Sequence, residues 1–216
     1  MPDEAAFPDI LPIFPLTGVL LLPRGRLPLN IFEPRYLAMF RDAMGGERLI
    51  GMVQPCDPPI RELNPAVYPL GCAGRITSFS ETDDGRILVS LTGVSRFRIR
   101  EELPLLSGYR RVIPEWDDFV EDRTPDEAGF DRSRLTQALR SFFGQRQLEA
   151  DWSAIEQAPG EHLVTSIAMM CPFAPSEKQA LLEAKTFGER ARLLTALIEM
   201  ALTAPPPDPE GGVTRH

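Results

Sequence analysis

Residues 70–94, LGCAGRITSFSETDDGRILVSLTGV, carry the clearest strand–turn–strand pattern of this 216-residue chain. Ile87, Val89 and Leu91 fall on one face of an extended segment, because successive side chains of a β-strand point to opposite sides. The Asp-Gly pair at 84–85 is a typical hairpin turn. This stretch therefore predicts a β-hairpin and, with its neighbours, a first half built mainly of strands.

Short apolar runs on both sides of this hairpin extend the β pattern. Prolines bound several of them, which is typical of short or edge strands rather than long central ones. Six or seven short strands with one inserted helix predict a strongly curved sheet or pseudo-barrel. The further strand candidates are LPIFPL (11–16), GVLLLP (18–23), RLPLNIF (26–32), LIGMVQP (49–55), SRFRIREEL (95–103) and YRRVIPEW (109–116).

The hydrophobic period changes at Pro34, inside the stretch NIFEPRYLAMF (30–40). Apolar residues recur there at helical spacing until a Gly-Gly pair, so we predict one amphipathic helix over 34–44. Pro34 suits the first helical position, where its missing N–H costs nothing. The carboxylate of Glu33 would face the positive end of the helix dipole. We expect Arg35 to bind a carboxylate or a carbonyl of the β part, which makes Glu33 and Arg35 structural ties.

A change in composition divides the chain. The segment 115–131 holds eight acidic residues against one arginine and so supplies −7 of the net charge of −8. We place a β domain at 7–117, a solvated acidic linker at 118–130, a helical bundle at 131–204 and a disordered tail at 205–216. The predicted fold class is α+β: an N-terminal β pseudo-barrel with one inserted helix, followed by a C-terminal helical bundle.

Helical signals dominate beyond the acidic segment. Ser176 with Gln179 and Thr186 with Glu189 match the capping-box pattern, so we expect separate helices to begin at these two places. Pro172 should end the helix that precedes them. Two apolar stripes at helical spacing are expected to face the core: Leu135, Ala138, Leu139, Phe142 and Phe143, then Leu163, Val164, Ile167 and Met170.

The sequence lacks the motifs of the most relevant enzyme classes, namely nucleotide hydrolases and serine hydrolases. Nucleotide hydrolysis needs a glycine-rich loop that ends in lysine, but the chain has only Lys178 and Lys185 and no GxxxxGK pattern. A serine hydrolase would need a GxSxG elbow, which the sequence lacks. A Ser-Lys dyad needs a desolvated lysine, whereas both lysines stand in a charged helical stretch beside glutamates. We therefore predict no catalytic residues, no enzymatic activity and no cofactor.

Metal binding and membrane insertion are not predicted either. Cys56, Cys72 and Cys171 lack a CxxC spacing, and two histidines are too few to complete a zinc site. The acidic residues of 115–131 do not follow a calcium-loop pattern. No apolar run reaches about eighteen residues, and the N-terminus is acidic where a signal peptide is basic. We expect reduced thiols, Cys56 being the most exposed, in a soluble cytoplasmic protein.

Aromatic side chains are the candidates for contacts with a polypeptide. A groove lined by aromatics can hold an extended segment that pairs with a strand edge through main-chain hydrogen bonds. Most aromatics at the observed spacings belong to the core, so few of them are expected to be exposed. The candidate polypeptide-binding residues are Phe32, Tyr36, Tyr68 and Trp116.

Arginines in the second half of the predicted sheet suggest an alternative ligand. Strict alternation in SRFRIREEL places its three arginines on the outer face, where they suit the phosphates of a nucleic acid. The outer face of an antiparallel sheet is often charged in any case, and neighbouring glutamates can pair with it. Thirteen arginines against ten acidic residues over 10–114 is a weak basic excess, so we disfavour nucleic acid. The residues of this alternative face are Arg96, Arg98, Arg100 and Arg111.

The order and spacing of these segments resemble the N-terminal domain of the Lon protease family, in its stand-alone form. Gly71, Gly74 and Gly93 match the family pattern and fit turns or close strand approaches. The matching pieces are LPIFPLTGVLLLPRGRLPLNIFEPRYLAMFRDAM (11–44), LIGMVQP, YPLGCAGRITSFSETDDGRILVSLTGVSRFRIRE (68–101), and YRRVIPEW before the acidic segment.

The resemblance implies a PUA-like β pseudo-barrel followed by a helical bundle. In full-length Lon proteins this region precedes an ATPase module and a Ser-Lys peptidase module and contributes to recognising substrate polypeptides. We therefore expect a non-catalytic module that binds unfolded or extended polypeptide segments or a partner protein, with a role in protein quality control. RNA binding through the PUA-like half is the alternative, and residual hydrolase activity is a third hypothesis. No membrane partner is expected, and a homo-oligomer is left open.

Overall fold

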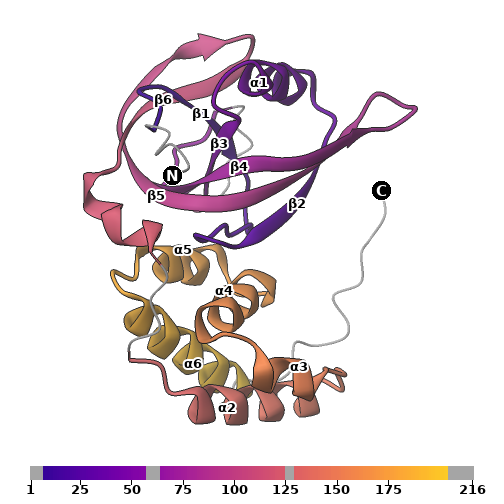
Figure 1. Ribbon diagram of the computed structural model, residues 1–216, viewed down its shortest axis with the longest axis vertical. Helices are drawn as coiled ribbons and strands as arrows, with labels where there is room; N and C mark the ends of the chain where they lie inside the picture. Colours follow the sequence, from indigo (N-terminus) through magenta and orange to yellow (C-terminus); the bar gives the residue numbers. More distant parts are fainter. Residues whose placement is uncertain (1–6, 57–63, 125–128, 204–216) are drawn as a thin grey trace.

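A computed structural model of the chain describes residues 7–56, 64–124 and 129–203 (Figure 1), so the predicted tail at 205–216 lies outside the described residues. The first half contains β1 (Leu11–Pro15), β2 (Arg26–Ile31), α1 (Pro34–Met44), β3 (Leu49–Val53), β4 (Leu70–Glu81), β5 (Ile87–Leu106) and β6 (Tyr109–Glu115). The second half contains the 3-10 helix η1 (Asp117–Arg123), α2 (Arg132–Gln145), α3 (Trp152–Gln157), α4 (Gly160–Met170), α5 (Pro175–Glu183) and α6 (Phe187–Thr203). Strands and helices form two layers, which confirms the α+β class.

The strands form one sheet in the order β2–β5–β4–β3–β1–β6, and β6 also pairs with β5. Five strands are thereby joined into a closed ring, and β2 is attached to β5 outside that ring. β5 makes the closure possible, because its 20 residues pair with β4 along the first part and with β6 along the last. The predicted pseudo-barrel is confirmed, although β4 and β5 are longer than the short strands expected.

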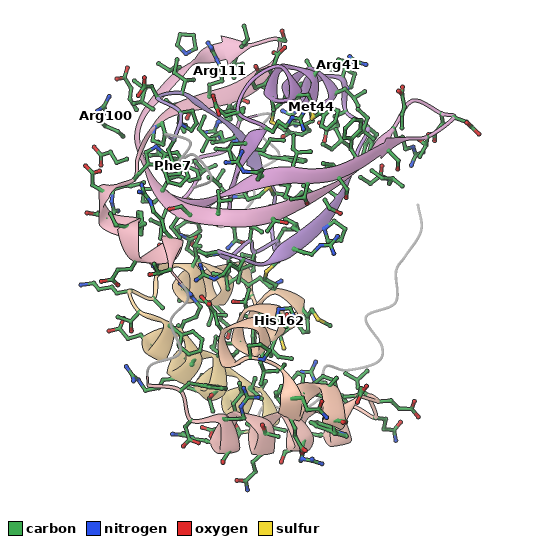
Figure 2. All side chains as sticks on the ribbon, in the orientation of Figure 1. Phe7, Arg41, Met44, Arg100, Arg111 and His162 are labelled. Carbon is green, nitrogen blue, oxygen red and sulfur yellow. The ribbon has the colours of Figure 1, made fainter. Side chains whose placement is uncertain are left out.

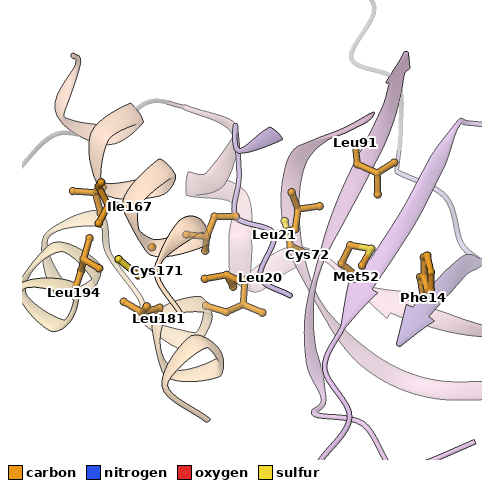
Figure 3. Packing of buried hydrophobic residues seen from close by; sticks show 14 of the residues in the cluster. Phe14, Leu20, Leu21, Met52, Cys72, Leu91, Ile167, Cys171, Leu181 and Leu194 are labelled. Carbon is orange, nitrogen blue, oxygen red and sulfur yellow. The ribbon is translucent and has the colours of Figure 1, made fainter. Parts of the chain in front are cut away.

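The segment GVLLLP (18–23), expected to be a strand, is not one. Its three leucines are buried, and Figure 3 shows Leu20 and Leu21 between the barrel and the helices. Gly93 holds the chain there: its N–H donates to the Gly25 carbonyl at 2.9 Å, and its carbonyl accepts from the Arg24 N–H at 2.7 Å. A Cβ on Gly93 would come within 2.0 Å of the backbone of this segment, so the close approach requires glycine.

Helix α1 has the predicted bounds 34–44. Glu33 is its N-cap residue but makes no capping bond, and its carboxylate instead binds Nε and Nη2 of Arg35 at 3.0 and 2.9 Å. The hydroxyl of Tyr109 donates to the Asp42 carboxylate at 2.7 Å and thereby joins α1 to β6. Burial and this hydrogen bond raise the pKa of Tyr109 to about 12. Glu33 and Arg35 thus form a local pair, and a partner for Arg35 from the β part stays a prediction.

The two predicted stripes of the helical half are buried with two departures. Phe143 is half-buried, and Met170 is 77% exposed because it is the last residue of α4, where the core no longer covers the helix. The other members of the stripes are buried: Leu135, Ala138, Leu139, Phe142, Leu163, Val164 and Ile167.

One of the two predicted capping boxes is wrong. Thr186 Oγ1 accepts from the Glu189 N–H at 3.1 Å, as the pattern at the start of α6 predicts. Helix α5, however, begins at Pro175, so Ser176 is already inside the helix. Gln179 is 2% exposed and donates to a β4 carbonyl at 3.3 Å, because it faces the barrel rather than the helix terminus.

The two layers meet along a polar seam beside the shared apolar core. Arg96 on β5 is 4% exposed and donates to the two carboxylate oxygens of Asp122 at 2.9 and 2.8 Å. It also donates to the carbonyls of Leu182, Ala184 and Lys185. Two predictions are therefore wrong: Arg96 is not on a solvent-facing surface, and the acidic segment is not a solvated linker at Asp122. The reason is that η1 and the α5–α6 connection cover this side of β5.

Lys178 also belongs to the seam and not to a solvated helix face. It is 7% exposed, and its amino group donates to the Gly18 carbonyl at 2.7 Å. Burial lowers the pKa of Lys178. Gln54 continues the seam, since its side-chain amide donates to the Pro175 carbonyl at 3.0 Å. Segments from both halves of the sequence are thus held together by directed hydrogen bonds.

Candidate functional site

The second edge of β2 is open, because within the described residues β2 pairs only with β5. The side chains at 27, 29 and 31 are buried or half-buried on the face that belongs to the barrel core. Those of Arg26, Pro28 and Asn30 are exposed on the other face. An open strand edge presents unpaired N–H and C=O groups, which another polypeptide can pair with.

A shallow groove of about 510 Å³ lies on the outer face of β2, β5 and β4, beside this edge. Strand register places Asn30 opposite Leu88, and Leu88 opposite Ser80, so these three side chains share the outer face. Leu88 is 45% exposed and forms an apolar point among small polar residues. None of the described residues that line the groove is charged; they come from 28–30, 78–80 and 88–90.

Two exposed phenylalanines belong to this region: Phe79 lines the groove, and Phe32 stands two residues beyond the lining residue Asn30. Phe32 follows β2, is 60% exposed, and has its ring centre 5.9 Å from the Arg86 guanidinium. Phe79 is 54% exposed, and its ring meets Phe40 of α1 edge-on with 5.3 Å between the ring centres. Together with Leu88 they give this part of the sheet an apolar surface on both sides of the strands.

The structure brings only one of the four predicted polypeptide-binding aromatics near this groove. Phe32 follows the lining residue Asn30 by two positions without lining the groove itself, whereas Tyr36 is 6% exposed and belongs to the core. Burial is also the main reason why the pKa of Tyr36 is raised. Tyr68 and Trp116 are half-buried. The Trp116 ring stacks on Phe7, labelled in Figure 2, with 4.3 Å between the ring centres.

Pro28 and Leu88 were not predicted as site residues. Leu88 stands between Ile87 and Val89, so a continuous apolar run hides which side chains point outward. The signal was available in principle: if Ile87 and Val89 face the core, alternation turns Leu88 to the outside. That the outer face beside Leu88 ends in an open edge depends on strand order, which no local pattern reveals.

The four arginines of the alternative nucleic-acid face do not form one surface. Arg96 is buried in the seam, where it binds the Asp122 carboxylate. Arg98 lies 3.6 Å from Asp118. Arg111 donates from Nη2 to a carbonyl of β5 at 3.2 Å, and in Figure 2 it lies at the top of the barrel while Arg100 projects from its left side. A continuous row of phosphate contacts is therefore not formed.

A larger cleft of about 860 Å³ lies between η1 and the α5–α6 connection. Charges of both signs line it: Arg98 and Lys185 are positive, and Asp118 and Glu183 are negative. Its wall includes Arg96, whose hydrogen bonds are already taken by the seam. A charged cleft suits an extended apolar segment less well than the uncharged groove at β2.

The described ranges hold neither a candidate metal site nor a helix that could cross a membrane. Within 7–56, 64–124 and 129–203 no group of three or more His, Cys, Asp or Glu side chains is placed to hold a metal ion. No helix in the described part combines the length and apolar character needed to cross a membrane. Cys72 and Cys171 are buried free cysteines and Cys56 is half-buried. Burial raises the pKa of Cys171 to about 11, which keeps it a packing group.

Comparison with known proteins identifies the family. Residues 10–200 match the family model described as the ATP-dependent protease La (LON) substrate-binding domain. The chain belongs to the Lon substrate-binding domain family. The match includes the barrel, the seam and the β2 groove, so the candidate site lies within the Lon domain.

Curated relatives of this Lon domain are much longer proteins. Lon protease 2 of Sorangium cellulosum is 30% identical over 203 residues, which cover 88% of this chain and 24% of the relative. Lon protease 2 of Myxococcus xanthus is 27% identical over 210 residues, which cover 91% of this chain and 24% of the relative. The chain therefore spans about a quarter of the length of these two relatives.

Two solved structures share the fold of this Lon domain. The N-terminal domain of Mycobacterium avium complex Lon protease has a TM-score of 0.64 at 14% identity and covers 88% of this chain and 98% of its own. A Lon N-terminal domain protein from Xanthomonas campestris has a TM-score of 0.58 at 24% identity, with 88% and 97% covered. These likenesses confirm the predicted Lon N-terminal domain fold.

Proposed function

We propose that this Lon domain binds an extended segment of another polypeptide along the open edge of β2 and does not act on it chemically. The observation that carries the proposal is the open edge beside a groove whose described lining is uncharged. The family description as a substrate-binding domain supports a polypeptide ligand, because the relatives are named as proteases.

In strand addition the main chain provides affinity, and the side chains provide specificity. Hydrogen bonds to the β2 backbone supply affinity without regard to sequence, and every second side chain of the bound segment lies over the outer face. Contact with Leu88 and Phe32 favours apolar side chains there. A charged side chain would lose its hydration in the groove without gaining a partner, so it is disfavoured.

The proposal includes a non-catalytic role in protein quality control, in the cytoplasm. The family match covers a substrate-binding domain. The amino group of Lys178, the buried lysine, donates to the Gly18 carbonyl at 2.7 Å and not to a serine, whereas a Ser-Lys dyad needs a lysine directed at the serine. Purified protein incubated with casein, with and without ATP, should release no fragments. Release that rises in proportion to the protein through successive purification steps would contradict this part.

Leu88→Asp tests the site directly, with Leu105→Asp as the matched control. Both leucines lie on β5 and are similarly exposed, at 45% and 48%, but only Leu88 lines the groove. We expect Leu88→Asp to weaken binding of a dye-labelled, permanently unfolded protein about tenfold or more in fluorescence anisotropy. Leu105→Asp should leave the Kd unchanged. Equal affinities of the two variants would contradict the proposed site.

A further inference from the structure

We infer that Pro28 makes the open edge of β2 reject a second copy of the same edge while it still accepts a strand from another polypeptide that brings its own N–H donors. Acceptance of a foreign strand rests on the proposed function. Rejection of a second copy rests only on the backbone chemistry of β2. The two parts can therefore be tested separately.

The position of Pro28 determines which backbone groups of β2 point outward. Successive residues of a strand direct their N–H and C=O groups alternately to the two sides, and paired antiparallel residues exchange both bonds or neither. Proline has no N–H, so a proline within a strand stands where the backbone nitrogen and carbonyl point away from the neighbouring strand. Pro28 lies opposite Ser90 in the middle of a continuous register, and it therefore directs its carbonyl away from β5. Arg26 and Asn30, two residues before and after it, do the same.

The open edge is consequently rich in acceptors. Arg26 and Asn30 each offer an N–H and a carbonyl, whereas Pro28 between them offers a carbonyl alone. An antiparallel strand from another protein would exchange two hydrogen bonds with Arg26 and two with Asn30, and would donate one to Pro28. The ligand residue that faces Pro28 must therefore carry an N–H, so it cannot itself be proline.

The same arrangement disfavours pairing between two copies of β2. In a two-fold antiparallel pair centred on Pro28, each proline carbonyl would face the nitrogen of the other proline, which carries no hydrogen, so both hydrogen bonds of that pair would be missing. Registers displaced from this centre pair fewer of the three outward-facing residues of β2 with one another. Proline is one of the residues by which natural edge strands avoid edge-to-edge association. Pro28 therefore selects for a foreign segment that brings its own donors.

Pro28→Ala tests this inference because it restores the missing N–H, and Asn30→Ala is the matched control. Asn30→Ala changes a side chain of the same edge but leaves its backbone donors intact. In sedimentation velocity over a wide concentration range, we expect Pro28→Ala to associate about tenfold or more tightly than the wild type. Asn30→Ala should sediment as the wild type does. Pro28→Thr also restores the N–H and has a higher β-propensity than alanine, so it serves as a second test if Pro28→Ala destabilises the strand.

Peptide binding supplies the second arm of the test. Pro28→Ala should bind an extended apolar peptide about three- to tenfold more tightly than the wild type, because the new N–H meets a peptide carbonyl. If no such peptide binds the wild type, the proposed function fails, and sedimentation alone then decides the inference. Unchanged sedimentation of both Pro28 variants would overturn rejection of a second copy. Peptide binding that Pro28→Ala does not tighten would overturn the placement of a ligand carbonyl opposite residue 28 while leaving the proposed function intact.

Discussion

At the scale of single residues, Arg96 shows how a surface prediction fails when a second layer covers the surface. Alternation with the fully buried Phe97 correctly turns Arg96 away from the barrel interior. The outer face at that point is not solvent, however, because η1 brings Asp122 against it. A partner 26 positions away leaves no local mark in the sequence. For this reason the outward direction of Arg96 could be predicted, but its partner could not.

Arg96→Met should be strongly destabilising. It would leave the Asp122 carboxylate buried without its partner, which typically costs about 3–5 kcal/mol of unfolding free energy. Urea denaturation measures the change. Arg98→Met is the control, since Arg98 is largely exposed and its contact with Asp118 at 3.6 Å should be worth less than about 1 kcal/mol. Similar losses for the two variants would mean that the buried pair does not hold the seam together.

At the scale of elements, prediction succeeded where the signals are local. Helix α1 was predicted with its observed bounds, because Pro34, the apolar period and the following glycines all act within a few residues. The segment 18–23 was not, because its leucines are buried from two sides by parts of the chain far away in sequence. Three consecutive leucines show no period that distinguishes a strand from a buried connection.

Gly93→Ala tests the close contact that places this connection. A Cβ would lie 2.0 Å from the Leu22 carbonyl oxygen, which is part of the backbone and cannot move alone. We expect a loss of about 2 kcal/mol or more in unfolding free energy, measured by thermal or urea denaturation. Gly144→Ala is the opposite control, because nothing lies within 4 Å of a Cβ there and α2 should gain about 0.5–1 kcal/mol. A neutral Gly93→Ala would contradict the packing described.

At the scale of the whole molecule, the barrel and the helices should unfold as one unit. Buried residues of both layers belong to one apolar cluster, from Phe14 and Met52 to Leu181 and Leu194 (Figure 3). Trp116 follows β6 and Trp152 begins α3, so each layer has its own fluorescent reporter. Variants that keep one tryptophan each, Trp116→Phe and Trp152→Phe, should show coincident urea transitions. Two separated transitions would show that the layers fold independently.

The fold class was predictable from the sequence, and the candidate site was not. Strand alternation and helical periods appear in segments of five to twenty residues, which is the size of the elements themselves. The open edge exists because β5 separates β2 from the closed ring, and this arrangement joins segments about 60 positions apart, such as Leu29 and Val89. The predicted domain boundary at 118–130 stays a proposal, to be tested by the same unfolding experiment.

Amide hydrogen exchange of β2, resolved by residue, tests the central claim most directly. The claim is that an extended polypeptide pairs with the outward backbone groups of this strand. With a saturating amount of an unfolded polypeptide, the Arg26 and Asn30 amides should exchange at least about tenfold more slowly, because they gain hydrogen bonds. The amides of Leu27 and Leu29, already paired with β5, should change little. Binding without protection of Arg26 and Asn30, or with protection confined to the cleft beside η1, would contradict the account.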